Sequence, residues 1–195
     1  AEGAAFVGFV FFPRSPRNVS LPQAAALAAR VPEGVRRVGL LVNADDGFLA
    51  ELVRQVPLDL LQLHGAETPD RVAAIRERTG KAVMKVLHLA EAADLAAVAG
   101  YLPVADRLMF EAKPPASMSN ALPGGNALAF DWSILAGRSF ARPWMLAGGL
   151  NAGNLKEAAA TSGARTVDVS SGVESAPGVK DPAKIRDFLR AARTL

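Results

Sequence analysis

Short runs of apolar residues alternate with alanine-rich stretches along the whole chain. The runs contain many β-branched and aromatic residues, whereas the stretches between them repeat apolar positions with the period of a helix. Because the runs are almost continuously apolar, they are typical of parallel strands that are covered by helices. We predict strands over residues 5–12, 37–42, 58–63, 82–87, 107–110, 144–147 and 166–169.

Capping residues mark the ends of the helices between these strands. A Ser, Thr or Asp just before a proline is typical of a helix N-terminus, and a glycine after a helical stretch is typical of its C-terminus. We expect the N-caps to be Ser20, Thr68, Asp131, Asn151 and Asp181. Gly80 and Gly163 are expected to end two helices.

Seven strand–helix units fit either a doubly wound α/β sheet or a (β/α)₈ TIM barrel that lacks one unit. No Gly-x-Gly-x-x-Gly motif follows the first strand, which disfavours a dinucleotide-binding sheet. Seven strands alone would leave two unpaired edges. We therefore predict a TIM barrel whose first strand and most of whose first helix precede Ala1, with residues 1–195 forming a single domain.

Composition narrows the classes of function. Of the 195 residues 50% are hydrophobic and 21% are charged, and the net charge is only +3, without a basic stripe that would favour nucleic acid. No run reaches the roughly 18 apolar residues of a membrane-spanning helix. The chain has no cysteine and two histidines, so a cysteine site or a histidine-rich metal site is not expected. We expect a cytoplasmic protein.

Polar residues that follow the strands are the candidates for chemistry, because functional groups of parallel α/β folds lie at the carboxyl ends of strands. Arg17 follows the first strand, where its guanidinium could bind a carboxylate or could simply be solvated. His64 follows the third predicted strand and is either a pocket donor or general base, or a residue that orients its loop. Lys85 lies within a strand and is expected to point inward.

The stretch RLMFEAKPP places Glu111 where a buried strand is expected to leave the core. A partly shielded carboxylic acid there is suited to donate a proton, because burial raises its pKa. The alternative is a rim carboxylate that pairs with Lys113, and the spacing favours neither. The long segment that follows, through PGGN at residues 123–126, is predicted to be a mobile lid.

Two glycine-containing loops follow the last two predicted strands. Gly148 and Gly149 follow one strand, and Ser170, Ser171 and Gly172 follow the next. Backbone N–H groups in such loops can bind a phosphate, and a phosphate site at this position recurs in barrel enzymes. Either loop alone could be a tight turn, but the two together favour phosphate binding.

The chain resembles phosphoribosylanthranilate isomerase, a family of tryptophan biosynthesis, from end to end. The resemblance rests on the motifs GFVFFPRSPRNVS, LLQLHGAE, LMFEAKPP, PGGNALAFDW, WMLAGGLNAGN and DVSSGVESAPGVKD. It implies a cofactor-free Amadori rearrangement of N-(5'-phosphoribosyl)anthranilate to 1-(2-carboxyphenylamino)-1-deoxyribulose 5-phosphate. Another phosphosugar isomerase or epimerase, or a catalytically silent phosphate-binding barrel, remains the alternative.

The resemblance also assigns roles to residues. It implies that Glu111 is the general acid, in a position where the family normally has aspartate, and that Arg17 holds the anthranilate carboxylate. It places Asp168 near the ribose hydroxyls, and Gly149 with the backbone of Ser170–Gly172 at the phosphate. The general base it implies is a cysteine, which we expect upstream of Ala1. The expected partner is the small-molecule substrate, bound by a monomer or a homodimer.

Overall fold

The structure is a computed structural model that describes residues 3–115, 124 and 128–195. Contacts divide these residues into two compact units. Unit 1 comprises Gly3–Lys85 and Gly100–Arg107, and unit 2 comprises Val86–Ala99 and Leu108–Leu195. The predicted single domain stays a prediction. Most of the segment in which the lid was predicted lies outside the described residues.

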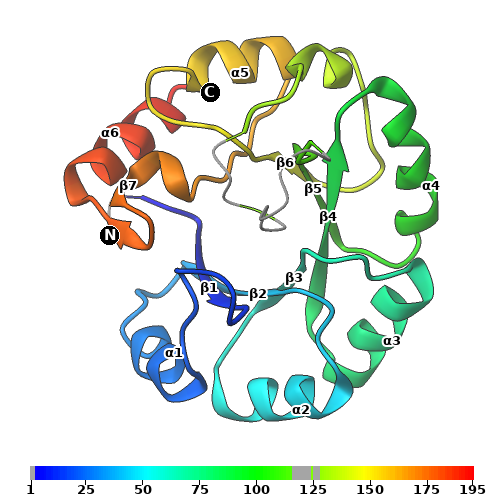
Figure 1. Cartoon of the computed structure of the whole chain (residues 1–195), viewed down its shortest axis with the longest axis vertical. Coiled ribbons are helices and arrows are strands. Elements are labelled where there is room, and N and C mark those ends of the chain that lie inside the picture. The colour runs from blue at the N-terminus through cyan, green and yellow to red at the C-terminus, as the bar shows by residue number, and fades with distance from the viewer. Residues whose placement is uncertain (1–2, 116–123, 125–127) are drawn as a thin grey trace. The chain divides into compact units, whose positions relative to one another are not determined.

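Unit 1 is built on parallel strands, each followed by a helix. Its strands pair in the order β1 (Phe6–Phe11), β2 (Arg36–Leu41), β3 (Leu60–Leu63) and the first half of β4 (Ala82–Leu89). The helices that connect them are α1 (Leu21–Ala28), α2 (Asp46–Gln55) and α3 (Pro69–Thr79). Figure 1 shows these three helices along one face of the strands. The strands are therefore covered on that face, as their continuous apolar character predicts.

Local capping explains where these helices begin and end. The Ser20 hydroxyl accepts a hydrogen bond from the Gln23 amide, and the Gln23 side chain accepts one from the Ser20 amide, which together form a capping box. The Thr68 hydroxyl caps α3 by accepting from the Arg71 amide, and Gly80 ends the helix with a φ of 61°. The predicted caps at these three positions are confirmed.

Unit 2 contains the second half of β4, followed by β5 (Arg107–Ala112) and β6 (Trp144–Leu146). Strands β5 and β6 are parallel, and the Lys113 amide donates to the Leu89 carbonyl at 2.9 Å, which ties the end of β5 to β4. The other helical elements that lie at least partly in unit 2 are η1 (Ala92–Ala97), α4 (Val98–Tyr101), η2 (Trp132–Leu135), α5 (Leu155–Ser162), η3 (Ser171–Val173) and α6 (Pro182–Ala192). An antiparallel hairpin of β7 (Glu174–Ala176) and β8 (Val179–Lys180) precedes α6.

Aromatic packing anchors β5 to β6 within unit 2. Phe110 is fully buried, and its ring centroid lies 4.9 Å from that of Phe140 and 5.6 Å from that of Trp144. The Phe110–Trp144 pair is edge-on, an arrangement that the ring quadrupoles favour. The packing fixes β5 immediately before Glu111.

The structure corrects several of the sequence predictions. The predicted strand over 166–169 is not a strand: Val167 forms only an isolated bridge with Leu146, because β6 is three residues long and offers little backbone to pair with. Asn154, and not Asn151, caps α5, and the Asn151 side chain instead accepts from the amides of Gly153 and Asn154 in the preceding turn. Strands β4 and β5 each continue two residues beyond their predicted ends, and β3 begins two residues after its predicted start.

The remaining predicted caps are confirmed. The Asp181 carboxylate accepts from the amides of Ala183 and Lys184 at the start of α6. The Asp131 carboxylate accepts from the Ser133 amide and begins the 3-10 turn η2. Gly163 ends α5 with a φ of 77°. In the part of the chain that the structure describes, no helix is long and apolar enough to cross a membrane.

Acidification should weaken the fold through Asp59. Its carboxylate accepts hydrogen bonds from the Arg37 guanidinium at 2.8 and 2.9 Å and from the Arg37 amide at 2.8 Å. The guanidinium holds the pKa of Asp59 below its usual value. A carboxyl group whose pKa is lower in the folded state stabilises the fold above its unfolded pKa, and this contribution is lost as the pH falls through the folded pKa.

We therefore expect Asp59→Asn to lower the melting temperature at pH 7, and the difference from the parent protein to shrink below about pH 4. Thermal melts of both proteins from pH 7 to pH 2 measure this difference. A difference that stays constant over the whole range would contradict the assigned role of the carboxylate.

Candidate active site

The carboxyl ends of the unit 2 strands bring most of the predicted site residues together. A small pocket of about 20 Å³ is lined by Glu111, Gly148, Gly149, Leu150, Asp168, Val169, Ser170 and Ser171. These residues come from the end of β5 and from the loops that follow β6 and the bridge at Val167. Parallel strands end at one edge, which is why residues far apart in the sequence line a single pocket.

Close backbone approach requires glycine in these loops. Gly148 has a φ of 88°, and a Cβ atom there would lie 3.1 Å from Cγ of Glu111 and 3.0 Å from the Ala112 amide nitrogen. Gly149 has a φ of 64°, and a Cβ atom there would lie 2.8 Å from the Ala129 amide nitrogen. Gly172 packs so closely on Leu150 that a Cβ atom would overlap the Leu150 carbonyl oxygen. The glycines therefore hold the two loops together beside Glu111.

Glu111 lies inside β5, not in the loop after it, and is only 7% exposed. The sequence offered Lys113 as a partner of Glu111, but the Lys113 ammonium lies 3.2 Å from the Asp94 carboxylate. The pKa of Asp94 is lowered, mainly by the hydrogen bond from the Ala90 amide. The burial disfavours the interpretation of Glu111 as a solvated rim carboxylate.

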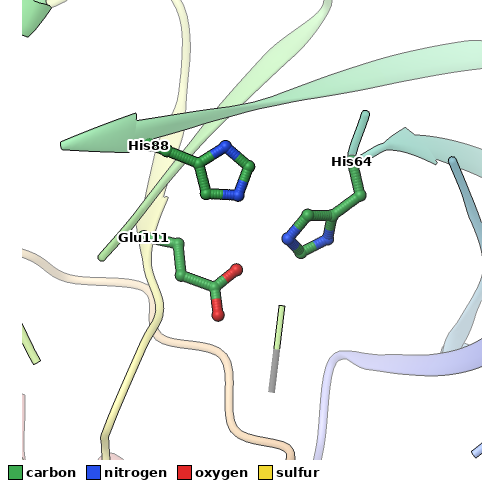
Figure 2. A group of neighbouring side chains, drawn as sticks. All are labelled: His64, His88 and Glu111. Carbon is green, nitrogen blue, oxygen red and sulfur yellow. The ribbon is translucent and has the colours of Figure 1, made fainter. Parts of the chain in front are cut away.

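His88, near the end of β4, is a neighbour of Glu111 that the sequence did not single out. Figure 2 shows both side chains extending to the same side of their strands, with the carboxylate beside the imidazole. A ring nitrogen of His88 and a carboxylate oxygen of Glu111 lie within 4.8 Å of each other. The two residues are separated by 22 others in the sequence, and they become neighbours only because β4 pairs with β5.

Unit 1 holds the other two predicted site residues. Arg17 is half-buried in the turn after β1, where its amide donates to the Ser15 hydroxyl at 3.2 Å. His64, labelled in Figure 2, directly follows β3 and is 4% exposed. The side-chain Nε2 atom of Gln62 lies 3.1 Å from Nδ1 of His64.

Lys85 is buried, as its predicted inward orientation requires. Its ammonium forms an ion pair of 2.7 Å with Glu67. Burial lowers the pKa of Lys85, and the Glu67 carboxylate opposes that shift. The sequence did not indicate Glu67 as its partner, because the two residues are 18 positions apart and neither follows a recognisable motif for pairing.

Lys180 is another residue that the sequence did not indicate. It lies in β8 and donates to the Ser170 carbonyl at 2.8 Å and to the Glu174 carboxylate at 2.8 Å. Its ammonium therefore ties the β7–β8 hairpin, which the sequence did not predict, to the loop that lines the pocket. No pattern in the sequence marks this hairpin, since its strands have only three and two residues.

Comparison with known proteins identifies the family. The model of the family "N-(5'phosphoribosyl)anthranilate (PRA) isomerase" matches residues 1–191. The chain belongs to the phosphoribosylanthranilate isomerase family. The N-(5'-phosphoribosyl)anthranilate isomerase of Paramagnetospirillum magneticum is 60% identical over 192 residues, which are 98% of this chain and 88% of that protein. That of Rhodospirillum centenum is 57% identical over 195 residues, or 100% of this chain and 91% of that protein.

Solved structures of phosphoribosylanthranilate isomerases resemble the chain as well. The enzyme from Thermotoga maritima is 33% identical with a TM-score of 0.87, and the match covers 100% of this chain and 90% of that one. A phosphoribosylanthranilate isomerase in complex with reduced 1-(o-carboxyphenylamino)-1-deoxyribulose 5-phosphate is 30% identical with a TM-score of 0.80, over 100% and 90% of the two chains.

The contact between Gly172 and Leu150 yields a prediction about the pocket. Gly172→Ala should force the two loops apart and lower the free energy of unfolding by about 1–3 kcal/mol, as overpacking does. Gly8→Ala is the matched control, because a Cβ atom at that exposed position meets nothing within 4 Å. Denaturant titrations of the two variants compare their stabilities. Equal stabilities would contradict the close approach of these loops.

Proposed function

We infer that this chain catalyses the isomerisation of N-(5'-phosphoribosyl)anthranilate to 1-(2-carboxyphenylamino)-1-deoxyribulose 5-phosphate, a step of tryptophan biosynthesis. Membership of the family, at up to 60% identity to isomerases of this name, is the observation that carries the inference. The substrate is a small anionic molecule, and the reaction moves hydrogen within it. We expect it to proceed in the cytoplasm, in a monomer or a homodimer.

Glu111 is the proposed general acid. It protonates the ribose ring oxygen, and the ring opens to a Schiff base between C1 and the anthranilate nitrogen. Removal of the C2 proton then gives an enolamine, which tautomerises to the ketone. The burial of Glu111 and its place in the lining of the pocket support this role, because an acid held there can reach a bound sugar. The 195 residues contain no cysteine, so the base of the second step is assigned to none of them.

The pocket beside Glu111 is the proposed site of the ribose phosphate. The backbone of Gly149, Ser170, Ser171 and Gly172 binds the phosphate in this proposal, with Gly148 keeping the backbone close to the acid. Asp168 lines the same pocket and hydrogen-bonds the ribose hydroxyls. Arg17 holds the anthranilate carboxylate, and His64 binds the substrate. The burial of His64 and the half-buried position of Arg17 are consistent with these roles.

We also propose that the fold is the (β/α)₈ TIM barrel predicted from the strand pattern. The alternation of parallel strands and helices in unit 1 supports it, as do the parallel strands of unit 2. In such a barrel the polar residues at the carboxyl ends of the strands belong to one active site.

The Glu111 proposal predicts a loss of turnover without a loss of binding. Glu111→Gln removes the acidic proton and should lower kcat by about 10²–10⁴-fold, the usual contribution of a general acid. Its affinity for reduced 1-(o-carboxyphenylamino)-1-deoxyribulose 5-phosphate, measured by calorimetry, should stay close to that of the parent protein. Glu111→Asp, which restores the usual acid of the family, is the control and should retain turnover. Near-normal kcat in Glu111→Gln would refute the assignment.

The Arg17 proposal predicts a loss that depends on the anthranilate half of the substrate. Arg17→Ala removes a charge-assisted hydrogen bond worth about 1.5–3 kcal/mol and should raise KM roughly 10- to 100-fold. Arg14→Ala, a change at an exposed arginine of the same turn, is the control. The inhibition constant of ribose 5-phosphate should not change in either variant. If Arg17→Ala weakened the binding of ribose 5-phosphate as much as that of the substrate, the proposed contact of Arg17 with the anthranilate carboxylate would be contradicted.

A further inference from the structure

The buried ion pair between Lys85 and Glu67 is an unusual feature of unit 1. Lys85 Nζ lies 2.7 Å from Glu67 Oε2, and the two side chains are only 3% and 1% exposed. Removing two charges from water is costly, and their attraction offsets that cost only where further hydrogen bonds satisfy both groups. A buried ion pair by itself is therefore weak evidence that the pair stabilises the fold. Its other hydrogen bonds indicate which backbone groups it holds in place.

The Lys85 ammonium binds the backbone on both sides of His64. It donates to the Leu63 carbonyl at 3.2 Å and to the Gly65 carbonyl at 2.7 Å. The Leu63 carbonyl belongs to the peptide group that precedes His64, whose amide donates in turn to the Leu41 carbonyl at 2.8 Å. The peptide group before His64 is thus fixed through both its oxygen and its nitrogen.

Glu67 fixes the peptide group that follows His64. Its Oε2 atom accepts from the Gly65 amide at 2.9 Å, and its Oε1 atom accepts from the Asn43 amide at 2.8 Å. The Asn43 side chain accepts from the Ala66 amide at 2.8 Å, and the Tyr101 hydroxyl donates to the Glu67 carbonyl at 2.9 Å. Hydrogen bonds of both the ammonium and the carboxylate therefore converge on Leu63 and Gly65, the neighbours of His64.

Gly65 is required for this closeness. A Cβ atom at position 65 would lie 2.7 Å from Cγ of Asn43 and 2.8 Å from Oε1 of Glu67. With both flanking peptide groups held, the Cα–Cβ bond of His64 has a fixed direction. The contact of Gln62 with Nδ1 then restrains the rotation of the ring.

We propose that Lys85 and Glu67 are positioning residues: through the peptide groups of Leu63 and Gly65 they fix the His64 imidazole in its substrate-binding orientation. The proposal rests on the proposed function, in which His64 binds substrate. The pair itself neither touches the substrate nor takes part in proton transfer. Its loss therefore affects substrate affinity more than the chemical step.

The test removes the pair without leaving a lone buried charge. The single variant Lys85→Met would leave the Glu67 carboxylate buried without its cation and could fail to fold for that reason. The test therefore uses the double variant Lys85→Met/Glu67→Gln, which removes both charges. Because the chain has only two histidines, their ring signals are readily separated by nuclear magnetic resonance. His64→Asn assigns the His64 signals by their absence.

We expect the ring nitrogen signals of His64 to move in the folded double variant. KM for N-(5'-phosphoribosyl)anthranilate should rise roughly 10- to 100-fold, as small misplacements of a binding group cause, and kcat should change less than about threefold. In a His64→Asn background the double substitution should raise KM no further. Asp59→Asn, which breaks an exposed ion pair before β3, is the control and should leave the His64 signals and KM unchanged.

Unchanged His64 signals in the folded double variant would overturn the positioning role. A rise in KM that persists in the His64→Asn background would overturn it too, because the pair would then act by another route. A normal KM in His64→Asn alone would refute the substrate role of His64 and with it the proposed effect on affinity. The ring spectra distinguish that failure from a failure of the pair to position the imidazole.

Discussion

Parallel backbone pairing is the constraint on which the candidate site depends. Parallel strands hydrogen-bond evenly to their neighbours and end at the same edge, so the residues at their carboxyl ends gather there. In unit 2 this brings Glu111 of β5, the loop after β6 and the loop after Val167 to one pocket. The same pairing sets His88 beside Glu111. The pocket is therefore a consequence of strand direction as much as of its individual residues.

Several polar and charged side chains are buried, and the fold must offset the free-energy cost of removing them from water. Glu111, Lys85, Glu67 and His64 are all less than 9% exposed, among buried side chains that are mostly apolar. Burying a charge without partners costs far more than any single hydrogen bond returns. Lys85 and Glu67 meet this requirement by neutralising each other and by binding backbone groups. The backbone next to His64 is ordered as a result, which links stability to the candidate binding group.

Glycines determine how closely the loops of unit 2 approach one another. At Gly148 and Gly149 a positive φ and a nearby backbone both exclude a side chain. At Gly172 the backbone conformation is ordinary, and the contact with Leu150 alone excludes one. The loop at Gly148 thus lies closer to Glu111 than a larger residue would allow. Lys180 adds a bond from the hairpin to the Ser170 carbonyl, and so restrains the loop from its other side.

The sequence by itself determined the features that depend on neighbouring residues. The caps at Ser20, Thr68 and Asp181 bind amides within three residues, so local chemistry alone specified where those helices begin. Apolar runs likewise predicted β1 to β6, although not the start of β3 or the ends of β4 and β5, because backbone pairing does not begin and end with the apolar run. The F-x-x-S-P-R loop, QLHG, and AGGL combined with DVSSGVE together indicated the family.

Only the tertiary structure decided which distant groups become partners. Lys113 pairs with Asp94, Lys85 pairs with Glu67, and His88 lies beside Glu111. Each of these pairs joins residues about 20 positions apart, and strand pairing and loop packing bring them together. The isolated bridge at Val167 was decided in the same way, by the shortness of its neighbour β6. Residue types along a chain specify local hydrogen bonds, but the partners of a buried charge depend on which segments pack against it.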